Sequence, residues 1–331
     1  LTYSLFIELA IALPSDGLPT PGGPYKHNIG DFISFLNLRT AKYSIILFFI
    51  SLISLFLVPF IGVEVKGSKR WIDLFFLPRF QPIEVLKPFL IIILATVFCD
   101  IRSNILFKYL ISIILISFIS ILLIAQPDIG QTLLVVFCWA TLIFTSGINI
   151  YILLGIFIAG ASLLAYLIIF VPKFDYIQGR IFSFFNRETG THNFQSDKAI
   201  ESITSGGFFG KGIGEGVLKN RVPEAHTDYI ISVISEEFGV VAIMLILLLF
   251  LILIYMVFKK ISFETNDKAK LILIGSISLI LMQATIHVGV NIRLFPTTGM
   301  TLPFLSYGGS SIISTSILAG IILNLTKRKI T

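Results

Sequence analysis

The segment VPEAHTDYIISVISEEFG, residues 222–239, places several acids at the start of a long apolar run. A carboxylate next to hydrocarbon is costly unless it is paired or takes part in chemistry, so each acid is a candidate functional group. If a helix begins at Asp228 and advances about 100° per residue, Glu236 lies on the Asp228 face and Glu237 on the opposite face. Glu236 would then lie about 12 Å deeper than Asp228. We expect this polar stripe to face protein or a water-filled cavity, with Asp228 at its mouth.

Each of these residues also has a structural interpretation. Asp228 or Thr227 could cap the N-terminus of a helix, since both residue types cap well. His226 could lie in a polar loop, and Glu236 and Glu237 could be buried partners that steady neighbouring helices, a role we favour for both over chemistry. Of these two, we expect Glu236 to line the cavity below Asp228 and Glu237 to pair with a donor on another helix.

The composition indicates a polytopic membrane protein. Of the 331 residues, 55% are hydrophobic and 13% are charged, and the mean hydropathy is +0.93. Runs of about 20 apolar residues recur, which predicts an all-α bundle of about eight spans. The predicted spans are 41–62, 82–99, 106–125, 129–147, 150–171, 228–257, 270–292 and 302–325. The polar loop 172–227 is too long for a simple connector and is a candidate functional element.

Basic residues indicate how the chain is oriented. With the C-terminus in the cytoplasm, the basic segments 39–42, 100–108 and 259–270 all fall on the cytoplasmic side, as the positive-inside rule expects. The opposite side breaks this rule, because the loop 63–81 contains Lys66, Lys69, Arg70 and Arg79. These cations could touch anionic lipid head groups, but their number favours an anionic ligand at the membrane surface. The net charge of +6 is therefore not taken as a sign of nucleic-acid binding.

Polar side chains gather at the same end of other predicted spans. They are Gln81, Glu84 and Lys87, then Gln126 and Asp128, then Thr297, Thr298, Ser306, Tyr307 and Ser310. We expect a site on this side of the membrane, although helix packing through Gly308 and Gly309 is an alternative for the last group. The glycine-rich segment 206–216 lacks the ending and context of a phosphate loop. His287 has no second ligand at metal-binding spacing, which favours a packing role.

The N-terminus fits the pattern poorly. Its apolar stretch LTYSLFIELAIAL is too short to span a membrane, and PSDGLPTPGGPYKHN shows no helical pattern. We therefore divide the chain into an atypical segment, 1–40, and a membrane domain, 41–331.

Six motifs together resemble those of the FtsW/RodA (SEDS) family. In chain order they are GSKRWIDL, FQPIEVLKP, AQPDIGQTLL, GGFFGKGIGEG, VPEAHTDYIISVISEEFG and PTTGMTLPFLSYGGSS. The forms GVEVKGSKRW, GEGVLKNRVPEAHTD and TTGMTLPFLSYGGSS look more like those of the division member, FtsW, than those of the elongation member, RodA. The chain departs from the family at Ile83, where a serine is usual. Its predicted spans correspond to the last eight of the family's ten, so we expect residues 1–33 to hold a truncated or frame-shifted start.

The resemblance implies a SEDS-type membrane glycosyltransferase that polymerises lipid II into peptidoglycan. The reaction would take place at the outer face of the bacterial cytoplasmic (inner) membrane during septal division. The family's essential acid, in its His-Thr-Asp motif, falls on Asp228. The implied partners are lipid II, a class B penicillin-binding protein transpeptidase, other divisome proteins and membrane lipid.

The implied chemistry suits one carboxylate. Transfer from an α-linked diphosphate to a β-glycosidic bond inverts the anomeric carbon, which needs one general base on the acceptor hydroxyl and no covalent intermediate. The leaving diphosphate must be stabilised by cations or by a metal ion such as Mg²⁺ or Mn²⁺. We expect Asp228 to be the base and Glu236 and Glu237 to support it. The expected substrate-binding residues are Lys66, Lys69, Arg70, Gln81, Glu84, Gln126, Asp128, His226, Thr227, Ser306, Tyr307 and Ser310.

Two other classes of function stay open at this stage. A lipid flippase would also need polar stripes and cations for a diphosphate head group, but the polar groups gather at one face, with little sign of a matching cytoplasmic site. A non-catalytic scaffold for a transpeptidase is the second alternative.

Overall fold

The computed structural model describes residues 40–65, 68–74, 77–100, 104–185, 191–218 and 222–327. The chain divides into two compact units, 1–40 and 41–331. The second unit holds the described helices and strands, apart from Thr40 at the start of the first helix. The predictions made for residues 1–33 therefore lie outside the described residues.

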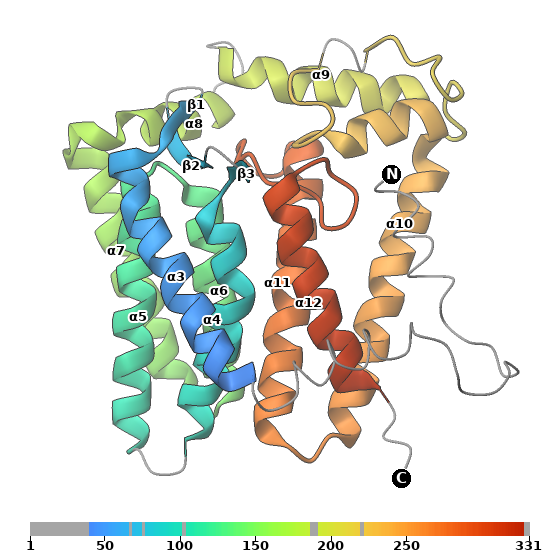
Figure 1. The fold of residues 1–331 in the computed structure, drawn as a ribbon. Coiled ribbons are helices and arrows are strands. Elements are labelled where there is room, and N and C mark those ends of the chain that lie inside the picture. Colours follow the sequence, from blue (N-terminus) through green and yellow to red (C-terminus); the bar gives the residue numbers. More distant parts are fainter. Residues whose placement is uncertain are drawn as a thin grey trace, which may run out of the picture. The chain divides into compact units, whose positions relative to one another are not determined.

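Within the described residues, apolar helices appear at all eight predicted positions (Figure 1). They are α3 (Thr40–Ile61), α4 (Pro82–Cys99), α5 (Ile105–Ala125), α6 (Ile129–Thr145), α7 (Ile150–Phe170), α10 (Ile230–Phe263), α11 (Asp267–Asn291) and α12 (Gly309–Thr326). Seven are long and apolar enough to cross a membrane, and α6, with 17 residues, is shorter. The chain is thus built as a multi-pass membrane protein.

Local sequence explains where several helices begin. The side chain of Asp128 accepts a hydrogen bond from Gln131 N and caps α6, and Asn266 accepts from Lys268 N and caps α11. Pro82 occupies the first turn of α4, where a missing N–H costs little. Polar residues between apolar runs therefore determine the helix boundaries.

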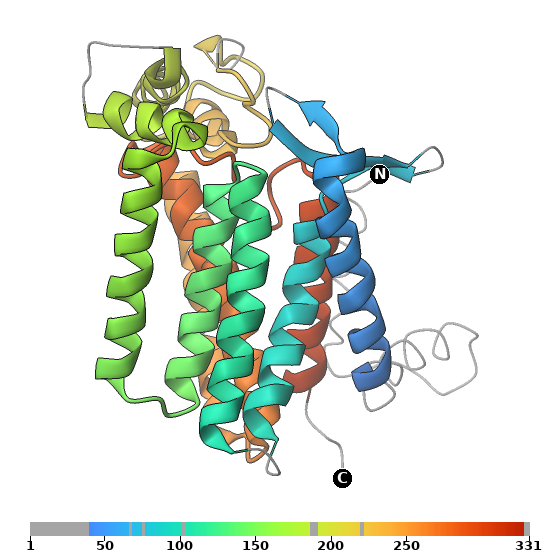
Figure 2. The same ribbon diagram turned by 90° about the vertical axis from the view of Figure 1, so that its left-hand side faces the viewer.

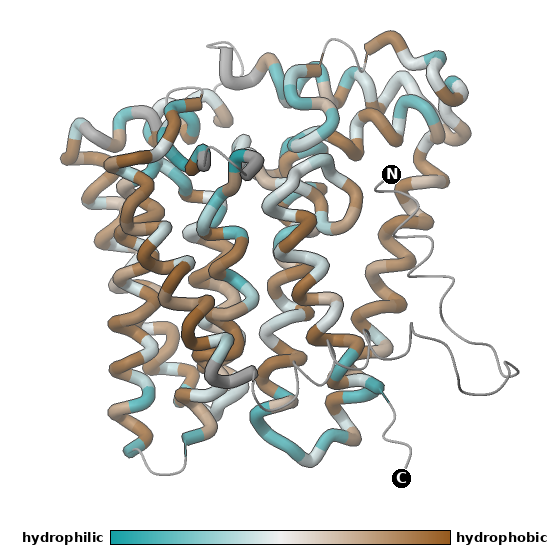
Figure 3. The backbone as a smooth tube through the Cα atoms, viewed as in Figure 1, coloured by the Kyte–Doolittle hydropathy of each residue, from teal (hydrophilic) through white to brown (hydrophobic). Residues whose placement is uncertain are grey.

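The helices differ sharply in how much of their surface is covered. In the most apolar windows of α4 and α11, 67% and 61% of residues are buried, whereas the value is 6% for α7 and for α10. Helix α11 packs against α4, α6, α10 and α12. Figure 3 shows long hydrophobic stretches on the outer helices and hydrophilic residues in the connections at both ends. The exposed apolar faces of α7 and α10 suit contact with lipid.

One end of the helices, here called the loop end, carries the remaining elements (Figure 1, Figure 2). Strands β1 (Val63–Val65), β2 (Ser68–Leu74) and β3 (Leu77–Phe80) form an antiparallel sheet in that order, with Val63 opposite Trp71 and Ile72 opposite Phe80. The 3₁₀ turn η1 (Pro172–Phe174) and helices α8 (Asp175–Phe185) and α9 (Thr191–Gly206) lie in the segment 172–227. Both segments were expected to be loops, so the sequence analysis missed this sheet and these helices.

Helix α10 begins two residues later than predicted and contains a break. Gly239 has φ 77° and ψ −177°, so the helical backbone is interrupted there. In Figure 1 the first part of α10 runs beside α9, with which it packs, and the longer part runs along the bundle. The predicted helix from 228 to 257 is therefore wrong in its first turns, and Glu236 does not lie below Asp228 along one straight axis.

The glycine-rich segment 206–212 supplies the hydrogen bonds that the break removes. Val240 N and Val241 N donate to the carbonyls of Gly207 and Phe208 at 3.0 and 3.3 Å. In the opposite direction, Lys211 N and Gly212 N donate to the carbonyls of residues 236 and 237 at 2.9 and 3.0 Å. Each of these backbone groups would otherwise have lost an intrahelical partner. The segment therefore acts as a splint across the break, and we call residues 206–212 the glycine splint.

Helix α12 begins at Gly309, whereas the sequence predicted a start at 302. The hydroxyl of Ser306 accepts a hydrogen bond from Leu302 N at 2.8 Å, and Ser306 N donates to Leu302 O at 3.1 Å. These two bonds close a turn that precedes the helix. A serine that binds the backbone four residues earlier competes with helix formation.

Candidate functional site

The His-Thr-Asp motif lies in a turn at the loop end, before α10 begins. Thr227 N, Asp228 N and Tyr229 N all point to Glu224 O, at 3.1, 3.0 and 3.3 Å. Glu224 has a positive φ of 56°. The N-cap of α10 is Tyr229, whose side chain makes no capping bond. The alternative that Asp228 or Thr227 caps this helix is therefore wrong.

Three consecutive carbonyls of this motif are each held by another part of the chain. Tyr307 N donates to His226 O at 2.9 Å, and Ser306 Oγ donates to Thr227 O at 2.6 Å. Asn291 Nδ2, at the end of α11, donates to the carbonyl of Asp228 at 3.1 Å. Asn291 and Ser306 are buried. Because the backbone of the motif is fixed in this way, its side chains are held in defined directions; we call these three bonds the carbonyl clamp.

The carboxylate of Asp228 lies next to the loop 297–299. A Cβ placed on Gly299, whose φ is 69°, would be 3.5 Å from Asp228 Oδ2. The same loop is held by α8, because Arg180 Nη1 donates to Thr297 O at 3.2 Å. Burial raises the pKa of Tyr229, the negative charge of Asp228 raises it further, and Arg180 acts in the opposite direction. Asp228 and Arg180 are thus both close enough to Tyr229 to influence it electrostatically.

An open pocket of about 720 Å³ lies beside the motif. Its lining residues are Val222, Glu224, Ala225, His226, Thr227, Val233, Glu237 and Tyr307. The side chains of His226 and Thr227 were predicted to bind substrate, and the structure places both at this pocket together with Tyr307, which is 77% exposed. Asp228 is the next residue along the chain but is not among the lining residues. Hydroxyls, an imidazole and an aromatic ring are suited to a hydroxyl-rich ligand such as a sugar.

The structure reverses the expected roles of the two acids in α10. Glu236 is fully buried and accepts hydrogen bonds from Leu218 N at 2.9 Å and from Ser202 Oγ at 3.0 Å, with Lys211 Nζ 3.6 Å away. Glu237 is partly exposed, accepts from Gly214 N at 3.2 Å and lines the pocket. The expectation that Glu236 lines the cavity and Glu237 pairs elsewhere was wrong, because Asp228 precedes the helix and does not share its periodicity.

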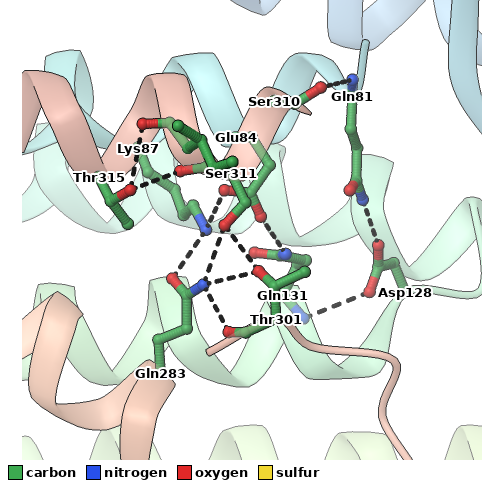
Figure 4. Close-up of polar contacts among 11 residues, drawn as sticks. Gln81, Glu84, Lys87, Asp128, Gln131, Gln283, Thr301, Ser310, Ser311 and Thr315 are labelled. Carbon is green, nitrogen blue, oxygen red and sulfur yellow. Dashed lines mark hydrogen bonds and ion pairs between the residues drawn. The ribbon is translucent and has the colours of Figure 1, made fainter. Parts of the chain in front are cut away.

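A second group of polar residues is buried between α4, α6, α11 and the turn before α12 (Figure 4). Lys87 Nζ lies 2.8 Å from Glu84 Oε2 and donates to Gln283 Oε1 at 3.3 Å. Gln131 Nε2 donates to Glu84 Oε1 at 2.6 Å, and Gln283 Nε2 donates to Thr301 O at 3.0 Å. A buried ion pair whose remaining groups are hydrogen-bonded is the arrangement that charges inside a membrane protein require. Glu84 therefore has a structural partner, and its direct contact with substrate stays a prediction.

Nearer the loop end, a related set of contacts joins β2, α4, α6 and α12. Gln81 Nε2 donates to Asp128 Oδ2 at 2.9 Å, and Gln81 N donates to Ser310 Oγ at 2.9 Å. Arg70 Nε donates to Gln126 O at 3.2 Å and lies 3.8 Å from Asp128 Oδ2. The buried side chains of Gln126, Asp128 and Ser310 thus face other parts of the chain. Substrate contacts by these residues were predicted, and the contacts seen here are structural.

The predicted cations divide between two environments. Arg70 is only 17% exposed in its side chain and is engaged with the α5–α6 connection, including the carbonyl of Pro127. Burial raises the pKa of Asp128, and the nearby charge of Arg70 opposes that rise. Lys69 is exposed on β2, and Lys66 lies outside the described residues. Of the described pair, Lys69 is the cation that faces solvent.

The described part of the chain contains no group of side chains that could hold a metal ion. Among those residues, no three His, Cys, Asp or Glu side chains gather as ligands of a metal ion. His287 is buried, and its Nδ1 donates to Met300 O at 2.7 Å. The predicted packing role of His287 agrees with this contact, and the divalent cation stays an expectation without assigned ligands.

Comparison with known proteins decides which family this arrangement belongs to. A family model described as "Cell cycle protein", for FtsW, RodA and SpoVE, matches residues 30–330. The chain belongs to this family. It is 35% identical over 275 residues to a Caulobacter vibrioides protein named "Probable peptidoglycan glycosyltransferase FtsW", covering 82% of this chain and 69% of that one. A protein of the same name from Enterococcus hirae is 33% identical over 282 residues, covering 81% and 70%.

Solved structures share the fold. A chain of a peptidoglycan synthase complex, described as coordinating polymerization and crosslinking, superposes with a TM-score of 0.72 at 26% identity, covering 90% of this chain and 86% of that one. RodA of Thermus thermophilus superposes with a TM-score of 0.64 at 27% identity, covering 97% and 91%. The predicted family and the SEDS-type helical fold are confirmed.

Sequence reasoning missed several residues of this FtsW/RodA site. Asn291 and Gln283 were not singled out, because a single amide in an apolar span gives little signal. Arg180, in the loop 172–227, was not singled out either. Helical spacing could have indicated one relation, since Gln283, His287 and Asn291 are each four residues apart and share a face of α11.

Proposed function

We propose that this chain, a peptidoglycan glycosyltransferase of the FtsW type, polymerises lipid II with Asp228 as the general base. In the proposed step Asp228 takes the proton of the acceptor sugar hydroxyl while that oxygen attacks the anomeric carbon of the donor. The bond between that carbon and the diphosphate oxygen breaks, and the diphosphate leaves with the electron pair. One carboxylate suffices because the configuration is inverted in a single displacement.

The carbonyl clamp is the observation that carries this proposal. Asn291, Ser306 and the backbone of Tyr307 hold the carbonyls of residues 226–228, so the motif is fixed by its backbone and its side chains are left to act. A general base must be positioned to within a fraction of an ångström, and support of this kind provides such positioning. The neighbouring pocket, with His226, Thr227 and Tyr307, would receive the sugar whose hydroxyl loses its proton.

The leaving diphosphate requires positive charge close to Asp228. Arg70 is engaged with the α5–α6 connection, so it is poorly placed for this task. Arg180 holds the 297–299 loop next to Asp228 and is within electrostatic reach of Tyr229. We assign the diphosphate to Arg180 and to the exposed Lys69, since hydrogen bonds between charged groups are about twice as strong as neutral ones.

The proposal also covers the orientation of the chain in the membrane and the protein that works beside it. The loop end would face the outside of the cytoplasmic membrane, and the C-terminus would lie in the cytoplasm, as the basic residues of the opposite connections predict. One structural relative belongs to a complex described as coordinating polymerization and crosslinking. We therefore propose that a class B penicillin-binding protein supplies crosslinking beside this chain.

Strand synthesis by the purified chain tests this function. The protein in detergent is incubated with lipid II labelled in its sugar, and the products are separated by length, with the same protein in vesicles assayed for lipid II movement between leaflets. Glycan strands made without any partner support the polymerase. Lipid II movement without strands, or strands only when a second polymerase is present, would support the flippase or the scaffold instead.

A further inference from the structure

Two phenylalanines of the glycine splint are displayed on the surface of the loop end. Phe208 is 75% exposed and Phe209 is 84% exposed. They are adjacent in the sequence GGFFG, between Gly206 and Gly210. Aromatic side chains of this size normally bury a large apolar area. Adjacent exposed phenylalanines in an ordered segment therefore indicate a surface that is covered in the working protein.

Backbone contacts between the glycine splint and α10 keep these two side chains exposed. Gly207 O and Phe208 O accept hydrogen bonds from Val240 N and Val241 N, so the segment is tied to α10 on its inner side. A Cβ on Gly210 would lie 2.2 Å from Glu237 O. The backbone of the splint is therefore pressed against α10, and its side chains at positions 208 and 209 are directed away from that contact.

The position of the phenylalanines identifies what covers them. The splint is bonded to α10 at Val240 and Val241, where the part of α10 that runs along the bundle begins. From there onward α10 presents a column of exposed apolar side chains: Val241, Met244, Leu245 and Leu248, at 51%, 61%, 58% and 54%. This column lies on a helix long and apolar enough to span the membrane, so it faces lipid. Phe208 and Phe209 lie beside the loop end of this column, because the backbone of their segment is hydrogen-bonded to Val240 and Val241.

We propose that Phe208 and Phe209 insert into the bilayer interface and form a lipid anchor for the glycine splint. Phenylalanine, like tryptophan and leucine, is typical of the apolar face of segments that lie in the membrane interface and bury it about 5–10 Å into the boundary between head groups and acyl chains. We take the occupant to be lipid because the segment is bonded to α10 where its lipid-facing column begins.

The anchor has a consequence for the pocket. The splint holds the carbonyl of Glu237 through Gly212 N, and Glu237 lines the pocket. Fixing the splint at the bilayer interface therefore fixes the level of one pocket wall relative to the membrane. A substrate that stays attached to a lipid would meet this wall at a constant depth.

Spin labelling in vesicles tests the anchor without reference to catalysis. A nitroxide is attached to Phe209→Cys in a chain whose two native cysteines, Cys99 and Cys138, are replaced. The chain is placed in vesicles of phosphatidylethanolamine and phosphatidylglycerol, and relaxation by oxygen is compared with relaxation by a water-soluble nickel chelate. Labels at Met244 and at Glu215, an exposed acid of the same connection, give the lipid and water references.

The proposal expects the label at 209 to relax more with oxygen than with the nickel chelate, as the label at Met244 does. Relaxation like that of the label at Glu215 would overturn it, because the side chain would then face water. Low access to both reagents would also overturn it, because another protein surface would then cover the position. A nitroxide at Phe208→Cys must give the same result, which excludes an effect of one labelled side chain.

Discussion

Hydrogen bonds to the backbone of Asp228 and of the preceding residue hold Asp228 in position. Its carbonyl is held by Asn291, the preceding carbonyl by Ser306, and its N–H donates to Glu224 O. Ser306 was expected to bind substrate, yet its buried hydroxyl contacts only backbone groups in the bonds seen here. At the residue scale, the residues that hold the proposed base in place are therefore different from the proposed base itself, and they should respond differently to substitution.

Ser306→Ala should slow strand synthesis by lowering kcat more than it raises KM. The substitution removes the donor to Thr227 O and the acceptor of Leu302 N, which costs about 1–3 kcal/mol when buried groups are left unsatisfied. The measurement is steady-state kinetics with lipid II together with a melting curve. Ser262→Ala, an exposed serine on the last turns of α10, is the matched control. A change confined to KM would point to a substrate contact by Ser306.

Glu236→Gln and Glu237→Gln should separate stability from activity. At 236 the buried carboxylate accepts from Leu218 N and lies 3.6 Å from Lys211 Nζ, so a neutral amide would lose the charge that strengthens these interactions and lower stability by about 1–3 kcal/mol. At 237 the side chain lines the pocket, so KM for lipid II should change while the melting temperature stays close to that of the wild type. Equal losses of melting temperature at both positions would contradict this division.

At the element scale, the break in α10 and its splint form one unit. The break at Gly239 lets the first part of α10 pack on α9, and the splint restores hydrogen bonds on both sides of the break. The pocket wall at Glu237 depends on that joint. A change in the fit between splint and helix should therefore act on stability and on the pocket together.

Gly210→Ala should destabilise the protein much more than Gly214→Ala. Both glycines have positive φ, 77° and 83°, so each alanine costs about 1–2 kcal/mol in the left-handed region. Only at 210 would the added Cβ also meet backbone, 2.2 Å from Glu237 O, whereas nothing lies within 4 Å of it at 214. Thermal melting in one detergent measures the difference. Similar melting temperatures for the two variants would show that the splint is not packed against α10.

Arg70→Gln should lower stability in a way that depends on pH. Burial already raises the pKa of Asp128, which makes the folded state less stable as pH rises through the range between the unfolded and folded values of that pKa. Removing Arg70 removes the charge that opposes this rise, so the loss should be largest at neutral pH and should shrink as acid protonates Asp128. Melting temperatures of the variant and the wild type across this pH range provide the test. A difference that stays constant with pH would mean that Arg70 acts only through its bonds to carbonyls.

Lys69→Gln tests the neighbouring cation of β2 and should affect substrate use and not stability. Because Lys69 is exposed, its loss should leave the melting temperature unchanged and weaken the use of lipid II. A charge-assisted hydrogen bond contributes about 1.5–3 kcal/mol, so a clear rise in KM is expected if Lys69 binds the diphosphate. Unchanged kinetics would remove Lys69 from the diphosphate site.

For the molecule as a whole, the apolar runs predicted the eight apolar helices seen among the described residues, and the family motifs predicted the class of enzyme. The errors came from places where chain geometry departs from a straight helix. Asp228 precedes α10, and Gly239 breaks it, so helical spacing assigned Glu236 and Glu237 to the wrong sides. The sheet β1–β3 escaped detection because β1 and β3 have only three and four residues and β2, SKRWIDL, has no regular alternation of apolar and polar residues. The burial of Asp128 and Ser310 depends on helices distant in sequence. Spacing along one element carries no information on such contacts.

The most direct test of the account is strand synthesis by Asp228→Asn. Asparagine keeps the shape of the side chain and leaves the carbonyl clamp in place, because those bonds involve the backbone, but an amide cannot accept the acceptor's proton. The purified variant is compared with the wild type and with Glu215→Gln, a control acid exposed on the same connection. We predict a wild-type melting temperature and a loss of glycan strands for Asp228→Asn alone. Strand synthesis by that variant at a rate near that of the wild type would contradict the assignment of Asp228 as the base.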